Sequence, residues 1–264
     1  MYQEFAHMYD EMMDEIPYEK WFECVRDYLE VQGYEKDSKV CELGCGTGTL
    51  TRMFHQAGYD IMGVDLSEEM LMEAREKCPD VMLVQQDITK LRLIEPVDVM
   101  IALCDTMNYL TEPESLQQAF HSVRRYLTRD GIFIFDLKTE YCFQQILGDQ
   151  TRVEEGTDYY SVWENTYFPE EKINQYVLNL FEEKENGLYE RSEEVHHQRA
   201  YERQEIEKML SQAGLVMKQW LGPEFKPHKD DKVERIYVVA VRKETENINE
   251  ANKTKLDNID GTDS

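Results

Sequence analysis

Basic residues are scarce in this chain. Lys and Arg number 29 against 54 Asp and Glu in 264 residues, which gives a formal net charge of −25 at pH 7. Proteins that bind nucleic-acid backbones or anionic lipid surfaces use basic stripes. Here no basic run is longer than a pair such as Arg124 and Arg125. DNA, bulk RNA and membrane surfaces are therefore not expected as partners.

Long apolar runs and paired cysteines are also absent. No stretch of about 18 apolar residues is present, so the sequence predicts no transmembrane helix, and residues 1–15 lack the apolar segment of a signal peptide. The six cysteines contain no CxxC pair, so neither a zinc site nor a disulfide framework is expected. We predict reduced thiols, no metal site and a cytoplasmic location. The sequence leaves both a monomer and a homodimer open.

From Lys39 to Ala240, short apolar runs alternate with segments of helical spacing. The expected strands are the apolar runs at residues 40–43, 61–64, 81–84, 97–103, 132–137, 216–220 and 235–241. The expected core helices carry apolar residues three or four positions apart, at residues 49–56, 67–79, 116–127 and 202–213. Strands that alternate with helices predict a parallel, doubly wound α/β sheet.

The alternation stops near position 150. Three runs rich in Tyr, Val and Trp follow, at residues 159–168, 173–182 and 189–201. Between the last two, Asn186-Gly187 favours a hairpin turn. These runs predict an insert of three antiparallel strands.

The sequence therefore divides into four parts. Helical spacing in residues 1–35 predicts an N-terminal helical cap. Residues 36–150 and 202–242 form the expected α/β core, and residues 151–201 form the antiparallel insert. Residues 243–264 are polar and lack aromatics, which predicts a disordered acidic tail.

The first expected strand runs into a glycine-rich loop. It reads Glu42-Leu-Gly44-Cys-Gly46-Thr-Gly48 and leads into the first core helix. Glycines at such positions let the backbone approach a ligand without a Cβ clash. A dinucleotide fingerprint places its third glycine one residue later, to fit the helix under a pyrophosphate. The spacing therefore argues against a nicotinamide oxidoreductase.

Three acids follow three successive strands. Glu42 is the penultimate residue of the first expected strand, Asp65 directly follows the second, and Asp87 comes three residues after the third. Because the carboxyl ends of parallel strands meet at one edge of a sheet, these acids should lie near one another, where open α/β sheets bind ligands. Each acid taken singly could instead cap a helix or belong to a loop.

With this combination of motifs, the chain resembles the class I S-adenosylmethionine-dependent methyltransferases over about residues 1–242. The resemblance implies a Rossmann-like doubly wound sheet of seven strands, mostly parallel with the last strand antiparallel, and S-adenosylmethionine as the cofactor. It also implies a set of cofactor-binding residues, which are Glu42, Gly44, Cys45, Gly46 and Gly48 around the methionine moiety, Asp65 and Leu66 at the ribose and adenine, and Asp87 and Ile88 at the adenine.

In this family the loop after the fourth strand meets both the sulfonium and the acceptor, which implicates Leu103 and Asp105. Asp105 could orient an acceptor amine or take its proton, and capping of the next helix is the alternative. N-terminal aromatics close over the cofactor in relatives such as glycine N-methyltransferase. The corresponding candidates are Tyr9 and Trp21, for which packing within a helix pair is the alternative.

The insert resembles the lid of glycine N-methyltransferase and of bacterial amino-sugar N-methyltransferases, and we call residues 151–201 the lid. Because side chains alternate along a strand, His197 and Arg199 share one face of the third lid strand, while His196 and Gln198 share the other. The sequence leaves open which face points inward. A histidine can act as a base near neutral pH, so His197 joins Asp105 and Tyr9 as a catalytic candidate.

The resemblance thus implies a methyltransferase that acts on a small-molecule acceptor, at an amine nitrogen or a hydroxyl oxygen, by direct in-line transfer. Two alternatives remain open at this point. One is a non-catalytic module that binds S-adenosylmethionine or another protein. The other is a methyltransferase that acts on a protein or an RNA with the help of a partner.

Overall fold

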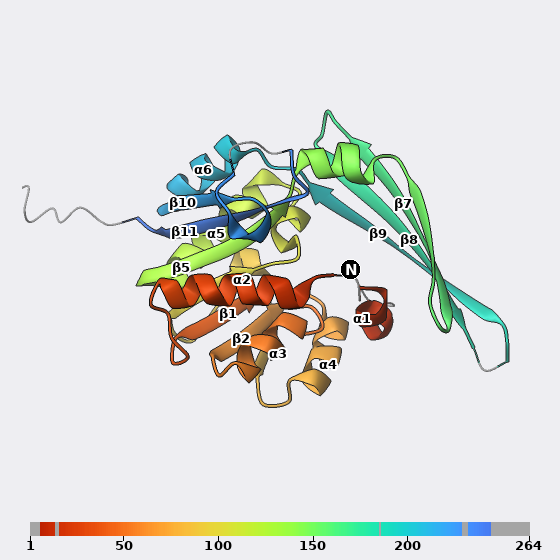
Figure 1. Ribbon diagram of the computed structural model, residues 1–264, viewed down its shortest axis with the longest axis horizontal. Coiled ribbons are helices and arrows are strands. Elements are labelled where there is room, and N and C mark those ends of the chain that lie inside the picture. Colours follow the sequence, from red (N-terminus) through yellow and green to blue (C-terminus); the bar gives the residue numbers. More distant parts are fainter. Residues whose placement is uncertain (1–5, 14–15, 185, 229–231, 244–264) are drawn as a thin grey trace, which may run out of the picture.

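The computed structural model describes residues 6–13, 16–184, 186–228 and 232–243. An α/β core is joined to a long antiparallel sheet that projects from one side of it (Figure 1). The core positions the candidate site, and the projecting sheet is the lid predicted from the sequence.

The core sheet has seven strands in the order β10-β11-β5-β4-β1-β2-β3. The strands are β1 (Lys39–Leu43), β2 (Asp60–Asp65), β3 (Met82–Gln85), β4 (Val97–Ala102), β5 (Leu127–Lys138), β10 (Leu215–Leu221) and β11 (Arg235–Arg242). Strands β1 to β5 are parallel, whereas β11 is antiparallel to both of its neighbours. The predicted doubly wound sheet with an antiparallel last strand is therefore confirmed. The strand order reverses between β1 and β4, which is where such sheets bind ligands.

Helices cover both faces of the sheet. They are α2 (Tyr18–Val31), α3 (Thr49–Gln56), α4 (Glu68–Lys77), α5 (Pro113–Tyr126) and α6 (Arg203–Gln212). Buried residues of α2 and α3 pack on one face of the sheet, and buried residues of α5 and α6 pack on the other. The two apolar layers hold the strand ends rigidly at the edge that carries the acids.

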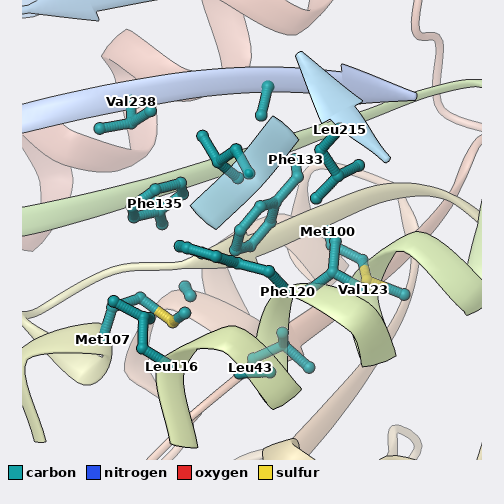
Figure 2. Close-up of a cluster of buried hydrophobic side chains, with 14 of the residues drawn as sticks. Leu43, Met100, Met107, Leu116, Phe120, Val123, Phe133, Phe135, Leu215 and Val238 are labelled. Carbon is teal, nitrogen blue, oxygen red and sulfur yellow. The ribbon is translucent and has the colours of Figure 1, made fainter. Parts of the chain in front are cut away.

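The larger apolar cluster centres on three phenylalanines (Figure 2). Phe120 of α5 contacts Phe135 of β5 at a ring-centroid distance of 5.5 Å, and Phe133 stacks on Phe135 at 4.8 Å. All three side chains are fully buried. Burial of each ring stabilises the fold by roughly 2–3 kcal/mol, so this cluster is a principal anchor of α5 on the sheet.

The lid contains one strand more than the sequence predicted. Its sheet has the order β6-β7-β8-β9, with strands β6 (Thr151–Glu155), β7 (Tyr159–Phe168), β8 (Ile173–Glu183) and β9 (Tyr189–Arg199). The additional strand is β6, which pairs antiparallel with β7. It lies at the edge of the sheet, and four of its five side chains are exposed. An edge strand without a buried face has no apolar alternation, which is the signal that the sequence prediction used.

The N-terminal segment contains a short 3₁₀ turn η1 (Ala6–Met8), helix α1 (Tyr9–Met12) and α2, which starts directly after Pro17. Met8 and Met12 pack against the inner face of the lid, next to Leu178.

The predicted disordered tail lies outside the described residues apart from Lys243. Within the described ranges, no helix combines the length and the hydropathy needed to cross a membrane.

Candidate functional site

A cavity of about 490 Å³ lies at the carboxyl ends of β1 to β4. The structure brings ten of the twelve predicted cofactor residues to its wall. They are Tyr9, Glu42, Gly44, Cys45, Gly46, Asp65, Leu66, Asp87, Ile88 and Leu103. Trp21 and Gly48 are not in the lining, and Tyr18 is a lining residue that the sequence prediction did not select.

The glycine loop wraps one end of the cavity. Backbone N–H groups of Gly44 and Cys45 donate to the carbonyl of Val64, at 2.7 and 3.0 Å, and fix the loop against β2. Gly44 has φ of +71°, and a Cβ at this position would lie 2.5 Å from the side chain of Thr106. Gly46 has φ of +54°, and a Cβ there would meet nothing within 4 Å. Since Gly46 also lines the cavity, a side chain at this position would take up ligand space.

Gly48 has a packing role. It is the N-cap of α3 with φ of +78°, and a Cβ there would come within 3.1 Å of the Ala74 Cβ on α4. The third glycine of the motif therefore allows α3 and α4 to approach each other closely. Gly48 shapes the loop without facing the cavity.

Glu42 is buried at the base of the cavity. Its carboxylate accepts a short hydrogen bond from the Thr51 hydroxyl. Burial, with a further contribution from the charge of Asp65, raises the pKa of Glu42 to about 8. A cationic ligand group beside Glu42 would favour its ionised form.

Asp65 links the second strand to the glycine loop. Its two carboxylate oxygens accept hydrogen bonds from the backbone N–H of Gly46 at 2.8 Å and of Ser67 at 2.9 Å. Burial raises the pKa of Asp65, although both hydrogen bonds oppose that effect. Each oxygen retains a lone pair, so the carboxylate can still accept hydroxyl groups of a ligand.

Asp87 lines the cavity two residues after the end of β3. It accepts hydrogen bonds from the backbone N–H and the hydroxyl of Thr89, at 2.9 and 2.7 Å. Burial alone would raise the pKa of Asp87, but the hydrogen bonds from Thr89 lower it overall. Asp87 is therefore an ionised acceptor at neutral pH.

Asp105 does not face the cavity, although its neighbours Cys104 and Thr106 line it. Its carboxylate pairs with Arg235 at 2.9 Å and with Lys138 at 3.1 Å. These two ion pairs outweigh burial and hold the pKa of Asp105 well below its usual range. A carboxylate that is engaged in this way is a poor proton acceptor, so the predicted catalytic role of Asp105 does not fit its surroundings.

His197 also lies away from the predicted site. It is exposed on the outer face of β9, whereas His196 and Gln198 are buried on the inner face. His196 Nε2 lies 3.1 Å from a carboxylate oxygen of Glu194, and its ring packs edge-on against Tyr109, which lines the cavity. The inner face of the lid therefore presents His196, and the interpretation of His197 as a catalytic residue is corrected accordingly.

Of the predicted N-terminal aromatics, Tyr9 reaches the cavity and Trp21 does not. Trp21 is buried one helical turn beyond Tyr18, with its ring under the guanidinium of Arg235 at 4.7 Å. Tyr18 lies at the first position of α2 and faces the cavity near Cys104. The family resemblance selected Trp21 for this wall, and the structure places Tyr18 there instead.

The helix α1 is attached to the glycine loop. Thr47 Oγ1 donates a hydrogen bond of 2.6 Å to Asp10, which also forms an ion pair with Lys77 of α4. These contacts hold α1, and with it Tyr9, at the cavity wall. The N-terminal cap and the glycine loop after β1 thus form one wall of the cavity.

The cavity wall carries five acidic residues. They are Glu42, Asp65, Glu68, Glu69 and Asp87, and the described lining contains no Lys, Arg or His. Glu194 of the lid lies close enough to Glu69 for their charges to interact. The electrostatic potential of this cavity therefore favours cations.

A second cavity, of about 720 Å³, is lined by residues at the end of β5 and in the segment that follows β9. Its wall includes Lys138, Lys172, Tyr201 and Trp220. None of the predicted cofactor residues lies in this wall. We therefore place the candidate site at the carboxyl ends of β1 to β4.

Comparisons with known proteins agree with this fold. The family model of a methyltransferase domain matches residues 40–131, which include the glycine loop and all three acids. The putative methyltransferase YqeM of Bacillus subtilis is 30% identical over 222 residues, or 82% of this chain and 87% of that protein.

Two solved structures share the architecture. An S-adenosylmethionine-dependent methyltransferase from Clostridium acetobutylicum has a TM-score of 0.81 and 27% identity, over 92% of this chain and 99% of that one. The sugar N-methyltransferase KedS8 from Streptoalloteichus has a TM-score of 0.75 and 18% identity, over 90% and 93% of the two chains. With its strand order, glycine loop and acids taken together, this chain belongs to the class I S-adenosylmethionine-dependent methyltransferases.

Proposed function

We propose that this protein transfers the methyl group of S-adenosylmethionine to a small-molecule acceptor, at an amine nitrogen in preference to a hydroxyl oxygen. The observation that supports this function is a single cavity that joins the glycine loop and the acids of β1 to β3 with tyrosines beside the lid. The fold shared with the sugar N-methyltransferase KedS8 supports a small acceptor of this kind.

The residues of the cavity fit the cofactor. Gly46 leaves open space where a side chain would stand, and the wall supplies carboxylates from Glu42, Asp65 and Asp87. By the family resemblance, Glu42 would hold the methionine part, Asp65 the ribose hydroxyls and Asp87 the adenine amino group. When bound, S-adenosylmethionine supplies a methyl group on a positively charged sulfur, which a nucleophile can accept without a covalent enzyme intermediate.

The chain's own contribution to such a transfer is alignment and exclusion of water. Tyr9 and Tyr18 line the cavity from the N-terminal cap, and Tyr109 lines it from the loop after β4. His196 packs against Tyr109 from the lid and holds that ring at the wall. These side chains would surround the acceptor and leave the nucleophile facing the sulfonium.

The charge of the site favours an amine over an acidic or phosphorylated acceptor. The ionisable residues of the described lining are acids and tyrosines apart from the thiols of Cys45 and Cys104. Glu194 adds a carboxylate from the lid near Glu69. A cationic amine would be concentrated here. After releasing its proton to solvent, its nitrogen would accept the methyl group as the bond between that methyl and the sulfonium breaks. All six cysteines are free, which agrees with the reducing cytoplasm we propose as its location.

Calorimetric titration with S-adenosylmethionine and S-adenosylhomocysteine tests the cofactor assignment. We expect micromolar binding by the native protein, and a loss of at least about tenfold in Asp65→Ala and in Gly46→Val. Asp60→Ala is the matched control, because Asp60 is an exposed acid at the opposite end of the same strand. No binding by the native protein, or an equal loss in Asp60→Ala, would overturn the assignment.

A second assay tests catalysis. Release of S-adenosylhomocysteine is followed with a panel of primary and secondary amines, amino sugars and hydroxyl compounds. Turnover with an amine supports the proposed acceptor class, and turnover with a hydroxyl compound alone contradicts the preference for nitrogen. Tight cofactor binding without turnover on any member of the panel would favour the non-catalytic module.

A further inference from the structure

A buried charge cluster lies directly behind the cavity wall. Its members are Asp105, Asp136, Lys138 and Arg235, whose formal charges sum to zero, together with the amide of Gln198. Asp136 is completely buried, and Gln198 is 1% exposed. Charges removed from water in this way must be paired and hydrogen-bonded, so the geometry of the cluster is tightly specified.

The cluster supports a turn that glycine would normally make. Cys104 and Asp105 both adopt left-handed backbone conformations, with φ of +59° and +56°. Non-glycine residues seldom adopt this region unless their surroundings hold them there. The two carboxylate oxygens of Asp136 accept the backbone N–H groups of Cys104, at 3.2 Å, and of Asp105, at 2.8 Å. Asp136 therefore holds this turn from behind, while Cys104 and Thr106 face the cavity.

Cations from two strands complete the cluster. Arg235 of β11 bridges Asp136 and Asp105, with one guanidinium nitrogen on each carboxylate. Lys138 of β5 approaches the other oxygen of Asp105 at 3.1 Å. The carboxylate of Asp105 is thus fixed by rigid strands of the core.

The lid supplies the remaining contact. Gln198 of β9 donates a short hydrogen bond from its amide to Asp105, and its amide oxygen accepts from the Tyr176 hydroxyl at 3.0 Å. Asn108, in the same loop as Asp105, donates to the backbone carbonyls of Arg199 at 2.8 Å and of Lys138 at 3.1 Å. The loop that forms the cavity wall is therefore held between the end of β5 and the end of β9.

We propose that Gln198 is a positioning residue, which aligns the Cys104–Thr106 wall of the cofactor cavity with the lid. This inference rests on the proposed function, because its effect is measured on S-adenosylmethionine. Gln198 acts through Asp105 and lies outside the described cavity lining. Without this hydrogen bond, Asp105 keeps its core partners but loses its direct contact with the lid, and the bond from Asn108 to the Arg199 carbonyl is left to hold the loop to β9. The Cys104–Thr106 wall therefore becomes less well defined.

The first variant is Gln198→Met, which keeps the length of the side chain and removes both hydrogen bonds. Gln175→Met is the matched control, because Gln175 is an amide on the outer face of the adjacent strand, opposite the exposed His197. We expect the dissociation constant for S-adenosylmethionine to rise about tenfold in Gln198→Met. We expect no change in Gln175→Met.

Alkylation of Cys104 provides a second readout that does not depend on the cofactor. Cys24 and Cys104 are partly exposed, whereas Cys41 and the remaining three cysteines are buried. In a Cys24→Ser background, iodoacetamide labelling resolved by mass spectrometry then reports on the turn at Cys104. Gln198→Met should accelerate labelling of Cys104 about tenfold and leave Cys41 unlabelled.

A charge-preserving exchange tests the pairing itself. Gln198→Glu alone places a second carboxylate against Asp105 and should weaken cofactor binding more than Gln198→Met does. Combining Gln198→Glu with Asp105→Asn restores one amide, one carboxylate and the zero net charge of the cluster. We expect this double variant to recover cofactor affinity and slow Cys104 labelling relative to Gln198→Glu.

Three results would overturn the inference. The first is unchanged cofactor affinity together with unchanged Cys104 labelling in Gln198→Met. The second is a parallel rise in Cys41 labelling, which indicates general loosening, and the third is failure of the double variant to recover cofactor affinity and slow Cys104 labelling. Failure of the native protein to bind S-adenosylmethionine would instead overturn the proposed function. In that case the labelling data still test the role of Gln198 in holding the turn.

Discussion

Cofactor affinity should depend steeply on pH because of Glu42. The pKa of this buried carboxyl is about 8 in the free protein. About nine in ten Glu42 carboxyls are then protonated at pH 7, and ionising them costs about 1.4 kcal/mol at pH 7 and about 2.7 kcal/mol at pH 6. If the cationic cofactor binds the ionised form, its affinity should rise roughly fiftyfold between pH 6 and pH 8 and less than about twofold above pH 8.

Titration calorimetry at pH 6, 7, 8 and 9 measures this dependence. Repeating the pH 7 titration in two buffers with different ionisation enthalpies should show release of about 0.9 proton per cofactor bound. Glu42→Gln is the control, because it removes the carboxyl and retains any titration of the cofactor itself. Equal cofactor affinity at pH 6 and pH 8 in the native protein would refute the reasoning. The same dependence of cofactor affinity on pH in Glu42→Gln would refute it as well.

The same linkage predicts the stability of the free protein. The usual pKa of Glu is about 4.5, and that of Glu42 in the folded protein is about 8. Between these two pH values, the folded state binds more protons at Glu42 than the unfolded state does. The contribution of Glu42 to the free energy of unfolding should therefore decrease as the pH rises through this window. Urea denaturation of the native protein and of Glu42→Gln at both ends of the window measures the difference, and a native stability that rises more steeply than that of Glu42→Gln would contradict it.

Three further predictions concern packing and the lid. Gly48→Ala should destabilise the protein by about 1–2 kcal/mol through backbone strain, and by more than Gly33→Ala does. Gly33 has φ of +85° but open space around its Cβ position, so equal losses of stability in chemical denaturation would contradict the packing role of Gly48. Phe120→Ala should cost about 3–5 kcal/mol in the same assay, because the side chain is fully buried between sheet and helix. His196→Ala should lower both the unfolding temperature and the turnover of whichever acceptor the panel identifies, whereas the exposed His197→Ala should stay within about 0.5 kcal/mol of the native stability.

Much of the core fold could be predicted from the sequence because its signals are local. Buried parallel strands give continuous apolar runs, and Gly44 and Gly46 mark the turn that follows the first of them. The strand β6 was missed because its exposed side chains carry no apolar alternation. The antiparallel pairing of the lid was predictable from the Asn186-Gly187 turn and from the alternation in its three longer strands.

The candidate site was less predictable wherever it depends on which face of an element points inward. Alternation separates His196 from His197, but only the packing of the lid against Tyr109 determines that His196 faces inward. Similarly, Trp21 lies under Arg235 at the other end of the chain. The carboxylate of Asp105 looked available in the sequence because its partners come from strands distant in the chain, which no local pattern reveals.

The position of Arg235 in the chain determines when the cavity wall can be completed. During synthesis, every residue of the glycine loop and all three acids leave the ribosome well before β11. Until Arg235 arrives, Asp105 and Asp136 lack the guanidinium that bridges them, and a buried pair of carboxylates without that cation is strongly disfavoured. A nascent or truncated chain that stops short of β11 thus contains the complete cofactor motif and still lacks the wall against which the methyl group would be transferred. The last strand of the sheet therefore supplies the cation that completes the cavity wall.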